Sequence, residues 1–332
     1  MKVTIPEELK KEVPQTTFGK ILSATPVVMA VVATMLAGLA SSEMTRAQYD
    51  RSLAAQQQSK AGDQWSFFQA KRLRGAYQQN TADLLQTIVE VHPFDLAALK
   101  TMAEQLPNSA ETAKTKSDLL SVLESSQQPL ALLQKGELPG TVPSVTIAPQ
   151  IKTALDTVEN LRTDTEVAAA LASVSNQSLE EAIRSSRDQS LAFDATTKPI
   201  NQVIDKLDSI LDRQPAMPKS GSAVAAGTTG SSLQRDFTAA RLKYAALRYE
   251  VEARLNQSIA NLYELQVRKS NISAERHHAR SQRFFFGMLG TQLAVIISTF
   301  AIAARQRNLL WSLAAVAGLL AVAFAIYVYL RL

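Results

Sequence analysis

Residues 284–330 read FFFGMLGTQLAVIISTFAIAARQRNLLWSLAAVAGLLAVAFAIYVYL, and this stretch decides the fold of the chain. Two apolar runs without a charged residue, Phe284–Ala304 and Leu309–Leu330, flank the basic segment 305–308. A helix of roughly 20 apolar residues crosses the ~30 Å hydrocarbon core of a bilayer, and each run is long enough. Backbone polar groups in lipid must be satisfied within the helix, so the sequence predicts two transmembrane helices, at 284–304 and 309–330, that form a hairpin.

A third apolar segment, residues 18–40, follows a polar tail at residues 1–17. We expect a retained transmembrane helix, because the tail is long and partly acidic and because Ser23 and Thr25 lengthen the apolar region beyond that of a signal peptide. A cleaved signal sequence is the alternative, since Gly38-Leu39-Ala40 resembles a small-residue cleavage site.

Small and polar side chains within the spans indicate contacts between helices. Ala314 and Gly318 are four residues apart, a spacing that lets helix backbones approach closely in lipid. Thr291 and Gln292 could each hydrogen-bond a neighbouring helix, for roughly 0.6–2 kcal/mol. No ionisable residue lies in the hairpin spans or in 27–40, which argues against a proton relay or a coupled ion site.

The middle of the chain reads as helical. Residues 41–213 have few helix breakers in their first half, and an apolar stripe there predicts a partner helix; it comprises Ser66, Ala70, Leu73, Tyr77, Leu84, Ile88 and Val91. Ser178-Leu179-Glu180-Glu181 has the form of a capping box, and a separate amphipathic helix is expected at 199–213.

A change of composition separates this region from the last helix. Residues 214–232 combine Pro and Gly with Ser, Ala and Thr, as flexible linkers do. Residues 233–283 then predict one long helix with the seam spacing of a coiled coil, carried by Leu233, Phe237, Ala240, Tyr244, Leu247, Val251, Leu255, Ile259 and Leu262. The predicted fold class is all-α: a membrane protein with three transmembrane helices and a long, partly coiled-coil extramembrane region.

Composition excludes several function classes. The 332 residues include no Cys, so disulfides, thiolate catalysis and Cys-ligated metals are excluded. The net charge of +5 is modest and both signs are mixed, which gives little support to nucleic-acid binding. No phosphate-binding loop, dinucleotide fingerprint, nucleophile elbow or His-Glu-x-x-His helix is present. We therefore expect no catalytic residue, cofactor or metal site, and a protein that is not an enzyme.

Residues 63–71 read DQWSFFQAK and crowd aromatic, acidic and basic side chains into little more than two helical turns. The segment resembles one in a family of bacterial membrane proteins with no assigned function, whose members carry a similar Asp-x-Trp-x-(Phe/Tyr)-(Phe/Tyr)-Gln-Ala-Lys motif after an N-terminal span. That family also closes with a helix entering a two-span hairpin with a basic turn. The resemblance covers roughly residues 20–90 and 235–330, and residues 93–232 look like an enlargement. It implies architecture and no reaction.

The candidate site is this motif, with Asp63, Trp65, Phe67, Phe68, Gln69 and Lys71 as its residues. Two interpretations stay open: the aromatic rings pack the first long helix onto the last one, or they line a ligand site. We favour packing, and hence a non-enzymatic, membrane-anchored helical scaffold that self-associates or holds other membrane proteins. The alternative is an accessory subunit of a transporter or envelope sensor with a ligand site near Trp65.

The orientation in the membrane follows from short charged segments. Arg305 and Arg307 favour the cytoplasm for the hairpin turn, and Lys2, Lys10 and Lys11 favour it for the tail. Residues 41–283 would then be periplasmic, with the spans in a bacterial inner membrane. Basic residues at 268–283 argue the opposite, but long loops translocate largely regardless of charge.

Overall fold

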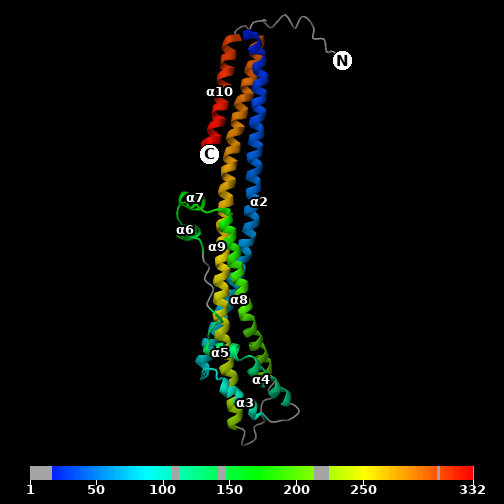
Figure 1. Cartoon of the computed structure of the whole chain (residues 1–332). Coiled ribbons are helices and arrows are strands. Elements are labelled where there is room, and N and C mark those ends of the chain that lie inside the picture. The colour runs from blue at the N-terminus through cyan, green and yellow to red at the C-terminus, as the bar shows by residue number, and fades with distance from the viewer. Residues whose placement is uncertain (1–16, 107–111, 141–146, 213–223, 305–306, 332) are drawn as a thin grey trace, which may run out of the picture. The chain divides into compact units, whose positions relative to one another are not determined.

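The computed structural model describes residues 17–106, 112–140, 147–212, 224–304 and 307–331, which contain helices and no strand (Figure 1). The all-α prediction is therefore confirmed. The chain divides into two compact units. Unit 1 comprises the described parts of Met1–Gln56 and Val267–Leu332, and unit 2 those of Gln57–Gln266.

Three helices contain the apolar segments of the chain: α2 (Thr17–Ile88), α9 (Val224–Ala303) and α10 (Arg307–Arg331). The shorter helices between α2 and α9 are α3 (Leu96–Gln105), α4 (Ala113–Ser125), α5 (Gln127–Lys135), α6 (Pro149–Glu159), α7 (Asp164–Ala172) and α8 (Asn176–Leu211). Both long helices contribute to each unit, because their sequences cross the unit boundaries at residues 56–57 and 266–267.

Each of α2, α9 and α10 contains a stretch long and apolar enough to cross a membrane, which confirms the predicted membrane-spanning character. In α2 and α9 the apolar stretch is only one part of a longer helix. No break separates residues 18–40 from 41 onward, or residue 283 from 284, since the helical hydrogen bonds simply continue from polar into apolar sequence.

Contacts within unit 1 fix the directions of its three helices. Ser281 on α9 donates a hydrogen bond to the carbonyl of Ala40 on α2 (2.7 Å), and His277 Nδ1 lies 2.6 Å from Glu43 Oε2. Residue numbers rise along α2 from Ala40 to Glu43, whereas those of their partners on α9 fall from Ser281 to His277. The two helices are therefore antiparallel. Trp311 at the start of α10 donates to Thr25 Oγ1 (2.9 Å), and Val328 near its end packs with Leu36. The helix α10 therefore runs parallel to α2 (Figure 1).

Small residues line the interior of unit 1. Buried positions recur every seven residues on α2 (Ala33, Ala40, Ala47, Ala54), on α9 (Gly287, Ala294, Ala301) and on α10 (Ala314, Ala321, Val328). At Gly318 the space that a Cβ would take is filled by the end of the Met29 side chain of α2, so a side chain rather than a backbone meets this glycine, and the predicted close backbone approach stays a prediction. Gly38 instead has open space around it and faces outward.

Unit 2 is built around a core that α8 and α9 share with the shorter helices. Leu207 and Ile200 of α8 and Phe237 and Tyr244 of α9 are buried in it, together with Phe94, Leu99, Leu119, Leu130 and Leu133. The segment that follows α2 contacts α9 through a hydrogen bond. The His92 backbone N–H donates to the Asp236 carboxylate (2.8 Å). These contacts position α2 and α9 for the site described below.

Several predicted boundaries in unit 2 are wrong. The segment expected as a separate helix at 199–213 is the second half of α8, which continues through Pro199 because burial of its apolar face outweighs the lost hydrogen bond. The expected linker lies outside the described residues at 214–223, whereas residues 224–232 belong to α9.

The helix caps also differ from the sequence prediction. Ser175, rather than Ser178, is the N-cap of α8, and its side chain accepts a hydrogen bond from the Ser178 backbone N–H. The capping box in the described chain precedes α7, where Thr163 and Glu166 exchange backbone and side-chain hydrogen bonds. The hydrogen bonds from Thr163 lower the pKa of the Glu166 carboxyl, because they favour its charged form.

The apolar stripe predicted to meet a partner helix is solvent-exposed in unit 2. Leu73, Tyr77, Leu84 and Ile88 are between 59% and 72% exposed. The face of α2 that meets α9 is a different one, with Ala61 and Ala82 fully buried and Gly75 against Tyr249. Small residues add little to an apolar pattern in the sequence, although they allow the closer approach of two backbones.

The predicted seam of the last long helix is largely buried. Leu233, Phe237, Tyr244, Val251, Leu255, Ile259 and Leu262 all lie in the interior. Ala240 is half-buried, and Leu247 is exposed beside a groove. Coiled-coil character itself stays a prediction.

Candidate functional site

The aromatic motif of α2 meets α9 through Trp65. The Trp65 indole N–H donates a hydrogen bond to Glu264 Oε1 (2.7 Å), which joins residues far apart in the sequence. The Trp65 and Phe68 rings lie edge to face with centroids 5.4 Å apart. Both side chains are half-buried rather than largely buried. The motif therefore contributes a polar anchor as well as apolar contact area.

Lys71 forms the second contact between the two helices. Its ammonium group makes an ion pair with Glu252 of α9 and lies 5.5 Å from the centroid of the Tyr249 ring. Glu252 is 6% exposed, so its carboxylate depends on protein partners for its solvation. Arg248 supplies another charge, with its Nε 3.4 Å from Glu252 Oε1 and its guanidinium 4.5 Å from the Tyr249 ring centroid.

The exposed carboxyl group of Asp194 on α8 lies near enough to these charges to interact with them electrostatically. Asp194 interacts electrostatically with Glu252, Lys71 and Arg248. Asp194 is exposed at the surface, and partial desolvation by its neighbours raises its pKa; repulsion from Glu252 adds to that effect, whereas the two cations oppose it. Three helices therefore bring together two cations and two carboxyl groups. We call Lys71, Asp194, Arg248 and Glu252 the charge cluster.

Tyr244 lies one turn before Arg248 on α9 and is buried, with no hydrogen-bond partner for its hydroxyl among the described residues. Burial raises the pKa of Tyr244 to about 12. The phenol is therefore neutral at physiological pH and acts as a core side chain rather than as an acid or base.

The remaining motif residues lie apart from these contacts. Asp63 and Gln69 are exposed on α2, and Phe67 is 54% exposed. The structure thus brings Trp65, Phe68 and Lys71 to the α9 side and leaves the other three facing outward. This division follows helical geometry, since Trp65, Phe68 and Lys71 are each three residues apart and so lie next to one another on one side of the helix.

Sequence reasoning missed Glu252, Glu264 and Asp194, the acidic partners of the motif. They lie within otherwise ordinary charged helices, and single-sequence periodicity does not identify which surface charge will meet a distant cation. The isolated Glu252 between Val251 and Ala253, both buried, is the one available signal, because a charge within an apolar face requires a partner.

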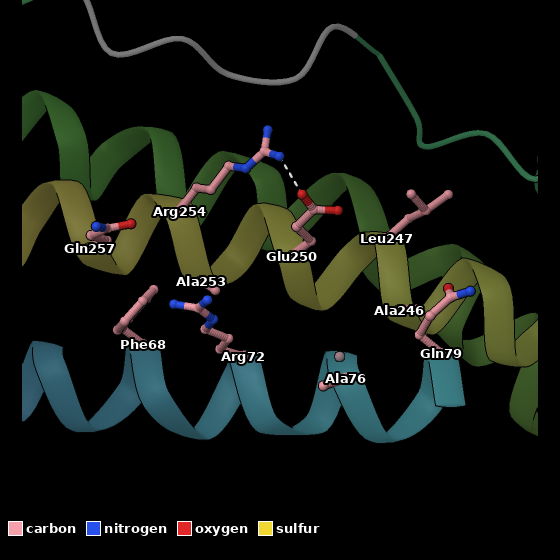
Figure 2. A pocket seen from close by; sticks show the side chains of 11 residues that line it. Phe68, Arg72, Ala76, Gln79, Ala246, Leu247, Glu250, Ala253, Arg254 and Gln257 are labelled. Atoms are coloured by element: carbon pink, nitrogen blue, oxygen red, sulfur yellow. Dashed lines mark hydrogen bonds and ion pairs between the residues drawn. The ribbon is translucent and has the colours of Figure 1, made fainter. Parts of the chain in front are cut away.

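A groove of about 430 Å³ lies beside the charge cluster, between α2 and α9 (Figure 2). Its floor includes Ala76 of α2 and Ala246 and Ala253 of α9. Arg72 lies between the two helices with its guanidinium 5.8 Å from the Phe68 ring centroid, and Arg254 pairs with Glu250 on the far side of α9 (Figure 2). The groove thus combines an apolar floor with one guanidinium that has no acidic partner among the described residues.

Within the described ranges, no group of three His, Asp or Glu side chains lies close enough together to hold a metal ion. The arrangement offers ion pairing, aromatic contact and a shallow groove.

Comparison with known proteins identifies one family model that matches part of the chain. No curated protein matches the chain, and no solved structure matches it either. The family model described as Domain of unknown function (DUF4337) matches residues 18–129. The match covers the first apolar span and the aromatic motif, and it extends beyond the limit near residue 90 that the resemblance suggested. The predicted likeness to an uncharacterised domain family is confirmed for residues 18–129 of the chain.

Proposed function

We propose that the chain is a non-enzymatic, membrane-anchored helical scaffold that self-associates. The observation that carries the proposal is the uncovered apolar stripe on α2, comprising Leu73, Tyr77, Leu84 and Ile88. These positions are spaced by four, seven and four residues, so they lie along one side of the helix. An exposed row of large apolar side chains outside the membrane is typical of a surface that binds another protein.

Membrane anchoring supports a second copy as the occupant of the stripe. Copies inserted in the same orientation are related by an axis perpendicular to the bilayer, and the commonest symmetric assembly is a two-fold dimer. Around that axis, α2 meets its counterpart in parallel and in register, so Tyr77 faces Tyr77 and Leu84 faces Leu84. Each apolar side chain then meets an apolar partner at the same height above the membrane.

The double variant Tyr77→Glu/Leu84→Glu tests the proposal. Wild-type protein in detergent should have the mass of a discrete oligomer by light scattering, and the variant should shift toward the monomer, since like charges would face each other. Leu191→Glu on α8 is the matched control, because Leu191 is also exposed and apolar but lies off the stripe. A monomeric wild type, or a variant that associates as the wild type does, contradicts this function.

The proposed location is a bacterial inner membrane, with residues 41–283 in the periplasm. The parallel course of α2 and α10 supports a common side for their first residues, because both then enter the bilayer from the same face. Arg307 begins α10 and Lys20 lies near the start of α2, and basic residues favour the cytoplasmic side.

An accessory subunit with a ligand site near Trp65 is the second candidate. The groove beside Phe68 supports it, since an apolar floor next to Arg72 fits an aliphatic chain with an anionic head. Titration of the Trp311→Phe variant with a long-chain carboxylate should then change Trp65 fluorescence with saturation. Arg72→Gln should weaken that response several-fold, and the corresponding long-chain alcohol should bind poorly. A fluorescence change that rises linearly with concentration and does not level off would contradict a binding site.

A further inference from the structure

Gln292 is a polar residue near the middle of the second apolar span, on its outer surface. It is exposed in unit 1, and its amide makes no hydrogen bond within the described residues. It lies about two residues from the centre of 284–304, or ~3 Å along a helix that rises 1.5 Å per residue. An amide at that depth is too far from either membrane surface for its side chain to reach water.

The other polar side chains of this span are satisfied locally. Thr291 donates to the Gly287 carbonyl (2.9 Å), Ser298 to that of Val295 (2.9 Å), and Thr299 also to Val295 (2.7 Å). A hydroxyl reaches the carbonyl one turn back on its own helix, whereas the primary amide of Gln292 carries two N–H donors and a carbonyl acceptor. Lipid chains offer none of these groups a partner.

We infer that Gln292 forms a reciprocal side-chain hydrogen bond with Gln292 of a second copy of the chain, and that this pair marks a dimer contact within the membrane. The inference deepens the proposed self-association. Copies with a common orientation place Gln292 at the same depth, and each amide both donates and accepts, so two of them satisfy each other across a two-fold axis. A partner of different sequence would need a polar group at just this depth.

The surroundings of Gln292 fit such a contact. Phe285, Leu289 and Ile296 precede and follow it at intervals of three and four residues, and all are exposed. They form an apolar row on the same side of α9, with the amide at its centre. Packing of this row against its counterpart would bury the amide pair away from lipid, where polar pairs help to hold helices together.

Oxidative cross-linking tests the contact directly. The chain contains no Cys, so Gln292→Cys introduces the single thiol. Treatment of native membranes with copper phenanthroline and dioxygen should join two thiols as a disulfide and give a product of twice the chain mass. Leu320→Cys is the matched control, because Leu320 is exposed on α10 in the same unit, and it should give little product.

Association of purified protein supplies the second measurement. Gln292→Leu removes the amide from an outward position without opening a cavity, and it should raise the dimer dissociation constant roughly three- to twentyfold. Gln292→Asn keeps a primary amide and should retain most of the affinity. Both can be followed by energy transfer between labelled copies in lipid vesicles.

Each outcome decides between the two levels of the proposal. A monomeric wild type overturns both the scaffold function and the Gln292 contact. A wild-type oligomer that persists in Gln292→Leu, with no doubled product from Gln292→Cys, overturns only the contact. A cross-linked product of another mass identifies a different membrane protein at Gln292 and also overturns the inference.

Discussion

Gly75 on α2 lies so close to Tyr249 on α9 that a Cβ added at residue 75 would be 3.3 Å from the Tyr249 Cβ. The backbone atoms of Ala246 and Glu250 are the next nearest. The missing side chain at residue 75 therefore sets how closely the two helices approach beside the groove, and neither neighbour can move as a flexible side-chain end would.

The two glycines within α2 of unit 2 should respond oppositely to substitution. Gly62 has open space around it, so Gly62→Ala should raise the free energy of unfolding by about 1 kcal/mol through helix propensity. Gly75→Val should lower it, because its extra methyl groups must push α2 away from α9. Thermal unfolding followed by circular dichroism gives both signs, and two shifts of the same sign would contradict this account.

Trp65 should contribute more stability than its neighbour Phe67. Trp65→Phe removes the hydrogen bond to Glu264 and should cost about 1–2 kcal/mol, whereas Trp65→Ala also removes half-buried ring area and should cost about 3 kcal/mol. Phe67→Ala, at an outward position, should change stability by roughly 0.5 kcal/mol or less. A Trp65→Ala protein as stable as the wild type would instead favour a ligand-binding role for the ring.

Asp194→Asn should stabilise unit 2 at neutral pH. The pKa of Asp194 is raised above its ordinary value of 3.8, so the folded chain binds its proton more tightly than the unfolded chain does. Ionisation of Asp194 therefore lowers stability as pH rises above 3.8, and the penalty disappears as pH falls back toward that value. The variant lacks the charge and should have the higher melting temperature near pH 7.

The difference between the Asp194→Asn and wild-type melting temperatures should shrink on acidification. Asp188→Asn, another exposed aspartate on the same helix but outside the charge cluster, controls for the general loss of a negative charge. Equal melting temperatures for wild type and Asp194→Asn at neutral pH would show that Lys71 and Arg248 fully offset the repulsion from Glu252.

Membrane orientation can be measured with single thiols. Asn308→Cys, at the start of α10, should resist membrane-impermeant thiol reagents in intact cells. Ser121→Cys, exposed on α4, should be labelled once the outer membrane is permeabilised, since we place unit 2 in the periplasm. The reverse labelling pattern would move the extramembrane helices to the cytoplasm and change which partners they meet.

The sequence was sufficient for features that depend on composition over long stretches. The runs around Gln292 and Trp311 identified helices able to span a membrane, because length and apolarity are additive along the chain. The buried seam of α9 from Leu233 to Leu262 was also predictable, since most of its large apolar residues meet the core.

Contacts that depend on pairing were not predictable from a single chain. The stripe containing Leu73 and Tyr77 had the spacing of a packing face, yet α9 lies against the side with Ala61, Gly75 and Ala82. Small residues bury less apolar area than large ones but allow close contact between backbones. Apolar periodicity alone therefore predicted the wrong face of α2 as the one that packs against α9. Likewise, no local pattern links Lys71 to Glu252, because the two residues meet only through the long-range pairing of α2 with α9.

The small residues of α9 in unit 2 recur at Ala239, Ala246, Ala253 and Ala260, every seventh position, and all are buried. A surface with such a repeat looks nearly the same after a slide of seven residues, so packing alone permits helices to settle in several alignments. The charged and aromatic contacts do not repeat: Lys71 meets Glu252 and Trp65 meets Glu264 in one alignment only. The polar contacts therefore specify one register of α2 against α9 among several that packing alone would allow. Their loss would produce a mixture of helical proteins with different registers of the two helices, rather than an unfolded chain.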